Sequence, residues 1–214
     1  YKSTDSGATW ALMTGFTAGG AGQGMAIWKN YLFVARATAI DVCGDGTATG
    51  ITNANWSNSW AGLTLTTDSL WHPMLVSKND NKLYIGGGRI VSSVDEVSGQ
   101  TFAPGSAGTY TATASALDLP PNYRIKCLEE LGNNLMIGTW QGTNVYDIRI
   151  ADIFPWDRSA SSFGQPISMN ENGVHFLLNI GNALIVGAGI AGQLYISDGV
   201  SASPIAQIPN DIAD

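Results

Sequence analysis

The feature that most constrains this chain is a short pattern that occurs four times along its 214 residues. Each copy reads Asn, any residue, Leu, a large apolar residue, Val or Ile, and then Gly or Ala. The β-branched residues at the fifth position are Val34, Ile85, Ile137 and Val186, which lie 51, 52 and 49 residues apart. A regular period of about 40–50 residues is typical of repeated structural units. The pattern therefore predicts four similar units in a row.

Each repeat predicts a hairpin of two apolar strands, of which the second carries the Leu-x-Val/Ile core of the pattern. Asn, Asp and Gly at the turns supply the positive φ angles that tight hairpins require. Nearly continuous apolar runs suit strands that are buried on both faces between neighbouring sheets. The predicted first strands are Met25–Trp28, Met74–Val76, Ile125–Leu128 and Phe176–Leu178, and the turns are Lys29–Asn30, Lys78–Asn81, Gly132–Asn134 and Gly181–Asn182.

The outer strands of the repeats are less regular in sequence. Asn144–Ile150 and Gln193–Ser197 predict third strands, and Ile40–Cys43 and Ile90–Val94 predict weaker ones. The stretch Gly99–Ser115 is rich in Gly, Ser, Thr and Ala, which predicts a loop or a loose outer hairpin.

These repeats predict an all-β fold, a β-propeller of four-stranded antiparallel blades with four repeats and a partial blade. We expect one propeller domain over residues 1–214, with blades at 21–68, 69–120, 121–170 and 171–214. Residues 1–20 are expected to be the outer half of a further blade. Closing such a ring should need more chain or a partner, so we expect the chain to be part of a longer protein.

The composition narrows the classes of partner. Only 13% of the residues are charged, the net charge is -7, and ten Lys and Arg are spread over the chain, so we expect no nucleic-acid partner. No apolar run is long enough to span a bilayer, so we expect no membrane insertion. The two cysteines, Cys43 and Cys127, fall at different places in their repeats and leave the redox compartment open.

Residues 3–10 read Ser-x-Asp-x-Gly-x-Thr-Trp, with Ser3, Asp5, Gly7, Thr9 and Trp10 at the defining positions. This motif resembles the Asp-box of the sialidase-type propellers. The resemblance implies a structural turn between the third and fourth strands of a blade, without a catalytic role. In that turn Asp5 would accept backbone N–H bonds, Gly7 would take a left-handed conformation and Trp10 would pack between sheets.

Two further resemblances are less specific. Ile137–Gly142 is similar to a blade motif of two-component regulator sensor propellers. The segments Phe154–Arg158, Asn172–His175 and Leu194–Tyr195 resemble propeller regions of tailed-bacteriophage structural and tail-fibre proteins. The second of these resemblances implies a virion as the setting.

The residues give little support to an enzyme. The sialidase resemblance implies three converging arginines, a Tyr–Glu nucleophile pair and an Asp acid/base, but the family's Arg-Ile-Pro signature is missing and Arg124-Ile125-Lys126 is the nearest approach. Glu129 and Glu130 lie beside a hairpin turn, where solvated side chains are expected. The sequence contains no Ser/His/Asp catalytic triad, no phosphate-binding Walker loop and no HExxH metal-binding helix. We therefore expect no catalytic residue, no cofactor and no metal.

Propeller geometry nevertheless predicts a binding face. The start of each innermost strand and the end of each second strand should emerge on one face around the central channel. Aromatic and cationic groups there would suit sugar rings and carboxylates. The alternative is that these side chains line a solvated channel and cap strand ends. The candidate ligand-binding residues are His72, His175, Lys126, Arg36, Arg89, Trp71, Trp140, Tyr123 and Arg124.

The favoured hypothesis is a non-enzymatic interaction module of a phage virion or an extracellular or cell-surface assembly. Its partners would be other protein subunits or a surface glycan. One alternative is a sialidase-type glycoside hydrolase whose catalytic residues lie outside these residues. Another is a sensor-type propeller domain of a receptor.

Overall fold

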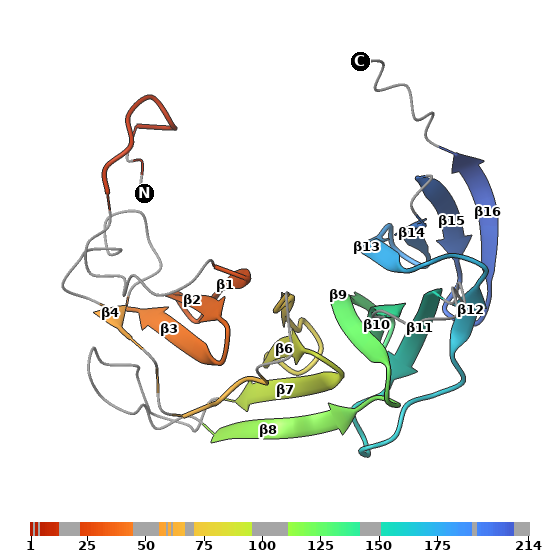
Figure 1. Cartoon of the computed structure of the whole chain (residues 1–214), viewed down its shortest axis with the longest axis horizontal. Helices are drawn as coiled ribbons and strands as arrows, with labels where there is room; N and C mark the ends of the chain where they lie inside the picture. Colours follow the sequence, from red (N-terminus) through yellow and green to blue (C-terminus); the bar gives the residue numbers. More distant parts are fainter. Residues whose placement is uncertain are drawn as a thin grey trace.

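The computed structural model describes residues 1, 3, 5–12, 22–44, 56–58, 60, 62–66, 71–95, 111–141, 151–189 and 192–207. These residues form four four-stranded antiparallel sheets, and no helix is present among them. Figure 1 shows the sheets following one another along an arc that stays open between the first sheet and the last. The all-β prediction is confirmed, and the described sheets do not close into a ring.

Each sheet is a meander, because its strands pair in chain order. Sheet 1 contains β1 (Gly24–Trp28), β2 (Tyr31–Arg36), β3 (Ala39–Cys43) and β4 (Trp56–Ser57). Sheet 2 contains β5 (Met74–Val76), β6 (Leu83–Gly87), β7 (Ile90–Asp95) and β8 (Thr111–Asp118). Sheet 3 contains β9 (Tyr123–Leu131), β10 (Asn134–Gln141), β11 (Ala151–Trp156) and β12 (Ile167–Met169). Sheet 4 contains β13 (Val174–Asn179), β14 (Leu184–Ala188), β15 (Gln193–Ser197) and β16 (Ala202–Gln207).

The inner hairpins form as predicted, with positive φ at their turns. Lys29 and Asn30 have φ of 53° and 64°, and Asn81, Gly132 and Gly181 have φ of 59°, 57° and 105°. Asn and Gly tolerate this left-handed region better than other residues. The turn chemistry therefore fixes where each inner strand reverses.

The outer strands differ from the prediction in one place. Thr111–Ser115 were expected in a loop or loose hairpin but belong to β8, which pairs along β7 from Asp95↔Thr111 to Ile90↔Asp118. The strand is held by this backbone ladder and by the Ser92 hydroxyl, which donates to the Ala114 carbonyl at 2.8 Å. Its Ala and Ser residues carry little strand signal, although Thr111 and Thr113 are β-branched. The predicted strand Asn144–Ile150 lies outside the described residues, and the third strand described in sheet 3 is β11.

Three hydrophobic clusters fill the junctions between successive sheets. The repeated pattern serves two clusters at once, since side chains alternate along a strand. In sheet 2, Leu83 and Ile85 pack in the cluster shared with sheet 1, whereas Tyr84 packs in the cluster shared with sheet 3. In sheet 3, Ile137 faces back to sheet 2 and Met136 faces forward to sheet 4.

The buried carboxylate of Glu130 holds sheets 2 and 3 together near the hairpin turns. The Glu130 carboxylate accepts bonds from the Ser77 hydroxyl at 2.7 Å, the Lys78 N–H at 2.8 Å and the Arg158 guanidinium at 2.5 Å. Glu130 is 7% exposed. The expectation of a solvated Glu130 is therefore wrong, because the turn of sheet 2 packs onto it.

The glycine that ends the pattern allows the sheets to approach. A Cβ atom built on Gly138 would lie 2.4 Å from the Cys127 sulfur and 2.8 Å from Val174 Cγ1 of sheet 4. Both neighbours are held in strands, so neither can move far. Packing between sheets 3 and 4 thus depends on the absence of a side chain here.

We predict that Gly138→Ala lowers the free energy of unfolding by about 1–3 kcal/mol, as overpacking of a tight core does. Urea denaturation measures this change. Gly164→Ala is the matched control, because a Cβ built there meets no atom closer than 3.4 Å. Equal stability of the two variants would contradict this account of the junction.

Candidate functional site

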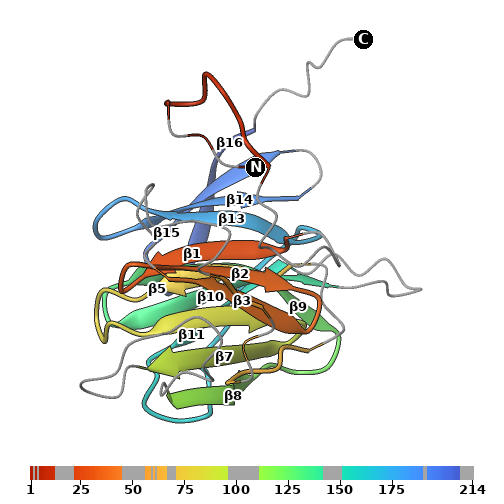
Figure 2. The same cartoon turned by 90° about the vertical axis from the view of Figure 1, so that its left-hand side faces the viewer.

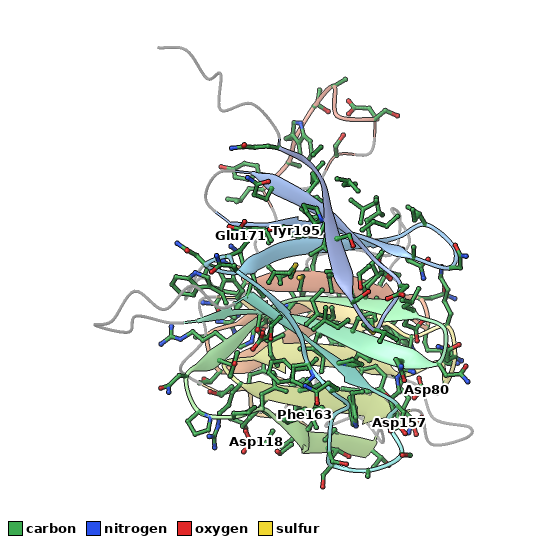
Figure 3. The ribbon with its side chains drawn as sticks, turned by 90° about the vertical axis from the view of Figure 1, so that its right-hand side faces the viewer. Asp80, Asp118, Asp157, Phe163, Glu171 and Tyr195 are labelled. Atoms are coloured by element: carbon green, nitrogen blue, oxygen red, sulfur yellow. The ribbon has the colours of Figure 1, made fainter. Side chains whose placement is uncertain are left out.

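The sheet junctions bring the predicted strand ends to one side of the molecule. The His72 N–H donates to the Gln23 carbonyl at 3.0 Å, and the Ile125 N–H donates to the Gly88 carbonyl at 2.7 Å. Trp140 forms an isolated antiparallel bridge with Gly173. We call this side, where β5, β9 and β13 begin and β2, β6 and β10 end, the entry edge. Figure 3 shows Asp118 and Glu171 on this side and Asp80 and Asp157 on the opposite side.

Four of the predicted residues meet at the entry edge, and we call them the Trp–Lys–His cluster: Trp71, Lys126, Trp140 and His175. The rings of Trp71 and Trp140 lie edge to face, with centroids 5.7 Å apart. The Lys126 ammonium nitrogen lies 4.9 Å from the Trp71 ring centroid and 2.5 Å from His175 Nδ1. Trp71, Lys126 and Trp140 are half-buried, and His175 is exposed. Three sheets therefore contribute to one aromatic and cationic surface.

Local irregularities aim these side chains. The register of β13 against β14 shifts between Val174 and Phe176, which leaves His175 as the extra residue of a β-bulge. Bulges commonly re-aim a side chain at the edge of a sheet. A Cβ built on Gly173 would lie 2.3 Å from Trp140 Cδ1, so the indole rests on a residue that has to be glycine.

The hydrogen bonds of His175 fit a neutral ring. Its Nε2 lies 3.1 Å from the Gly189 carbonyl oxygen, which can only accept, so Nε2 carries the proton and Nδ1 accepts from Lys126. Burial and the charge of Lys126 lower the pKa of His175 below its usual value, against the opposing effect of the Gly189 carbonyl. Burial likewise lowers the pKa of Lys126. The positive charge of the cluster therefore resides on Lys126.

His72 does not belong to this cluster, although it occupies the matching place in its repeat. It is 0% exposed, and its ring nitrogens lie 3.0 Å from the Gly86 carbonyl oxygen and 2.7 Å from the Ala37 carbonyl oxygen. The ring is enclosed where sheet 1 packs on sheet 2. The prediction of a ligand-facing His72 is therefore wrong, and the residue joins the two sheets.

The predicted arginines are engaged in ion pairs or lie beside the cluster. Arg36 is buried, and its Nε and Nη2 atoms donate to the two carboxylate oxygens of Asp41 at 2.5 and 2.8 Å. The prediction that Arg36 faces a ligand is therefore wrong. The hydrogen bond to Asp41 raises the pKa of Arg36. Arg89 pairs with Asp118 at 2.9 Å, and both side chains are exposed. Arg124 lies on β9 opposite Trp140, which puts it next to the cluster.

Tyr123 forms a polar contact that the sequence does not reveal. Its hydroxyl donates to Asp152 Oδ2 at 2.5 Å, and its ring meets the Phe154 ring edge to face at 4.9 Å. Burial and the bond to Asp152 raise the pKa of Tyr123 to about 12. Asp152 is 3% exposed, and its Oδ1 atom has no hydrogen-bond partner among the described residues. Sequence analysis missed Asp152 because the third strand was expected to end before it.

Glu171 is a second residue of the entry edge that sequence analysis did not select. Its Oε1 atom accepts the Tyr195 hydroxyl at 2.9 Å, and Figure 3 shows the two residues side by side. Its Oε2 atom lies 2.0 Å from a Cβ built on Gly189, the residue whose carbonyl accepts from His175. No motif distinguishes Glu171 in the sequence, because its role depends on a glycine 18 residues further along the chain.

The N-terminal motif forms a self-contained turn. Asp5 accepts the Thr9 N–H at 2.8 Å and the Thr9 hydroxyl at 2.6 Å, and the Gly7 N–H donates to the Ser3 hydroxyl at 2.7 Å. Gly7 has the expected positive φ, at 92°. The bonds from Thr9, and then that from Ser3, lower the pKa of Asp5 to about 2. Residues 3–10 therefore form a turn held by their own hydrogen bonds.

Trp10 differs from the expectation for this motif. It is 63% exposed, and its indole N–H donates to the Gly7 carbonyl at 3.1 Å. Figures 1 and 2 show residues 5–12 standing away from β1–β4. Trp10 therefore folds back onto its own turn and does not pack between sheets.

Asp residues also accept backbone N–H groups in two turns that connect third and fourth strands. Asp157, between β11 and β12, accepts the Ser159 N–H at 2.9 Å. Asp198, between β15 and β16, accepts the Val200 and Ser201 N–H groups at 2.9 and 2.8 Å. These two turns accept from residues two and three places further along the chain, whereas Asp5 accepts from Thr9, four places further along.

Two classes of feature are absent from the part of the chain that the structure describes. No group of three or more His, Cys, Asp or Glu residues is placed to hold a metal ion. No helix there is long and apolar enough to cross a membrane.

No protein-family model and no curated protein matches the chain. Among solved structures, the computationally designed Ika4 protein is similar over 84% of this chain and 92% of its own, with a TM-score of 0.50 and 15% identity. The computationally designed Ika8 protein is similar over 85% of this chain and 72% of its own, with a TM-score of 0.29 and 14% identity. The likeness to Ika4 concerns the fold alone, and the TM-score of Ika8 is too low for an argument.

We predict that the His175 ring titrates below its ordinary pKa of 6.5 and that Lys126→Met raises its midpoint, because the variant removes a neighbouring positive charge. As the pH falls in the wild-type protein, His175 is protonated in the unfolded chain at a higher pH than in the folded chain. His175 therefore leaves the folded state fully stable above about pH 6.5 and destabilises it as the pH falls towards the lowered pKa.

NMR titration of the ring resonances measures the midpoint, and His175→Gln assigns the signal. Lys78→Met, which alters an exposed lysine on the opposite side of sheet 2, is the control and should leave the midpoint unchanged. A wild-type midpoint at or above 6.5 would contradict the neutral ring.

Proposed function

We propose that this chain is part of a β-propeller that acts as a non-enzymatic interaction module, and that the Trp–Lys–His cluster contacts the ligand. The four consecutive four-stranded sheets and their shared pattern support the propeller, as does the Asp-centred turn at residues 3–10. The observation that carries the function is the meeting of two indole rings and one ammonium group from different repeats at the entry edge.

The chemistry of the cluster favours an acidic glycan as the ligand. Indole faces stack on the apolar faces of sugar rings, and an ammonium group attracts a carboxylate or sulfate. Lys126 supplies that charge within a chain whose net charge is -7. A half-buried cation beside aromatic rings loses less of its attraction to solvent than a fully exposed lysine does.

A role in an assembly on a virion or cell surface follows from the resemblance to phage tail proteins. In that setting the propeller would present the entry edge to a host glycan or to a neighbouring subunit. A sensor-type domain of a receptor remains the alternative with the same ligand-contact surface.

The arginines give the glycoside hydrolase alternative less support. A sialidase needs arginines that converge on one substrate carboxylate, whereas Arg36, Arg89 and Arg158 pair with Asp41, Asp118 and Glu130 in different sheets. Tyr123 and Asp152 form a hydroxyl–carboxylate pair, but no arginine contact to that pair is present among the described residues.

We predict that the wild-type chain binds acidic oligosaccharides on a glycan array and that Trp140→Ala and Lys126→Met each weaken binding about tenfold, or about 1.4 kcal/mol. Loss of Lys126 should also reduce the salt dependence of binding. The matched controls are Trp10→Ala and Lys78→Met, which remove an exposed Trp and an exposed Lys distant from the cluster.

If Trp140→Ala and Lys126→Met both leave binding unchanged, the entry edge has a structural role and does not contact the ligand. Hydrolysis of a fluorogenic sialoside by the wild-type protein would overturn the non-enzymatic function. Calorimetric titration with the glycan that binds most strongly on the array then measures the affinity in solution, without multivalent binding to the array surface.

A further inference from the structure

The two end sheets carry junction positions that no other sheet of the described residues covers. The internal junctions show how the matching positions pack elsewhere. On the inner strands, Met74, Leu128 and Leu177 pair across from Ile85, Ile137 and Val186 of the repeated pattern and pack against the preceding sheet. In sheet 1 the matching residue is Met25, which pairs across from Val34. Met25 is 70% exposed, and Ile27 on the same face is 58% exposed. We call this surface of β1 the back face.

Sheet 4 has the complementary surface. Phe33, Tyr84 and Met136 of the repeated pattern are at most 2% exposed, because each faces the sheet that follows. The matching residue of sheet 4 is Ile185, which pairs with Leu178 on β13 and with Ile196 on β15.

Leu178 is 53% exposed and Ile196 is 37% exposed. Phe176, on the same face of β13, is 42% exposed and lies over Gly187, as Cys127 lies over Gly138 in sheet 3. We call the surface formed by Phe176, Leu178, Ile185, Leu194 and Ile196 the front face.

We propose that the front face of one copy of this chain packs on the back face of a second copy. The contact would repeat a junction that the chain already makes three times, always with a front face against a back face. Sheet 1 therefore exposes a back face and sheet 4 exposes a front face, and these are the two kinds of surface that meet at each internal junction. Figure 1 shows that sheets 1 and 4 of one chain stay apart, so these two sheets do not cover each other.

The chemistry of the two faces suits this partner. Every named residue of both faces is uncharged and apolar, so joining them places no unpaired charge in the contact. Adjacent exposed apolar residues that are not scattered singly mark interaction sites on soluble proteins. An acidic or basic partner would find no complementary charge there.

The contact joins unlike surfaces, so each copy offers one front face and one back face. Such head-to-tail contacts close into a ring when the rotation between copies allows it. With two copies, a two-fold axis forms both contacts at once and leaves neither face exposed. We therefore expect a dimer in which the two arcs face each other.

Sedimentation equilibrium of the whole chain tests this inference. The expected mass is twice the 22.5 kDa of one chain. Ile27→Asp on the back face and Leu178→Asp on the front face should each convert the protein to monomers at the same concentration. Val200→Asp is the matched control, because Val200 is 83% exposed but lies in the turn between β15 and β16. It should remain dimeric.

Mixing the two single variants distinguishes a head-to-tail contact from one between like faces. Each variant retains one intact face, so the mixture should regain a two-copy species through one native contact. If Ile27→Asp alone stays dimeric, the contact joins two front faces and the proposal is overturned. A monomeric wild-type chain, or an assembly of three or more copies, also overturns it.

Ile27→Asp and Leu178→Asp alter exposed residues, so both variants should fold. Their folding is measured separately from their association. Circular dichroism and a urea midpoint measured below the dissociation concentration should match those of the wild-type monomer. As a second probe, Ile27→Cys and Leu178→Cys in different copies should form an intermolecular disulfide on mixing under oxidation, while Val200→Cys with Ile27→Cys should not. Equal cross-linking of both pairs would contradict a specific contact.

Discussion

The packing of each sheet against the next is the constraint on which the rest of this structure depends. A four-stranded sheet of mostly apolar residues has two faces to bury, and in sheets 2 and 3 both are covered by neighbouring sheets. The repeated pattern satisfies both neighbours because alternate side chains point to opposite faces. A slip of one residue would exchange the faces. The Asn and Gly turns prevent such a slip, since they fix where β1, β5, β9 and β13 reverse.

The same packing produces the candidate site. Lys126 lies at the register shift of β9 against β10, two residues along the strand from Arg124, which pairs with Trp140. Because sheet 3 packs on sheet 2 on one side and sheet 4 on the other, Lys126 and Trp140 reach Trp71 and His175. A central sheet thus gathers side chains from three repeats without any dedicated loop. The glycines that let the sheets approach also set how closely these side chains meet.

The inner hairpins, the turns and the side of the molecule that carries the site could be predicted from the sequence, because they follow from local spacing. The environment of each side chain could not. His72 and His175 occupy matching places, yet one is enclosed between sheets and the other is turned outwards by a β-bulge. Arg36 reads as a free cation until the structure places Asp41 beside it. Glu130 reads as a solvated turn residue, but its partners Ser77 and Arg158 lie 53 and 28 residues away in the chain.

Matching positions in the repeats have therefore taken different roles on one backbone frame. The position two residues before Met74, Leu128 and Leu177 carries His72, Lys126 and His175 in successive sheets. His72 joins sheets 1 and 2, and the contact between Lys126 and His175 joins sheets 3 and 4. Each junction also has a backbone contact at this edge: the His72 N–H to Gln23, the Ile125 N–H to Gly88, and the Trp140–Gly173 bridge. Lys126 and His175 are more exposed than His72, so the same position presents a charged or polar group at the surface in the later sheets. The packing of sheet 3 between sheets 2 and 4, rather than any single motif, brings the aromatic and cationic groups together.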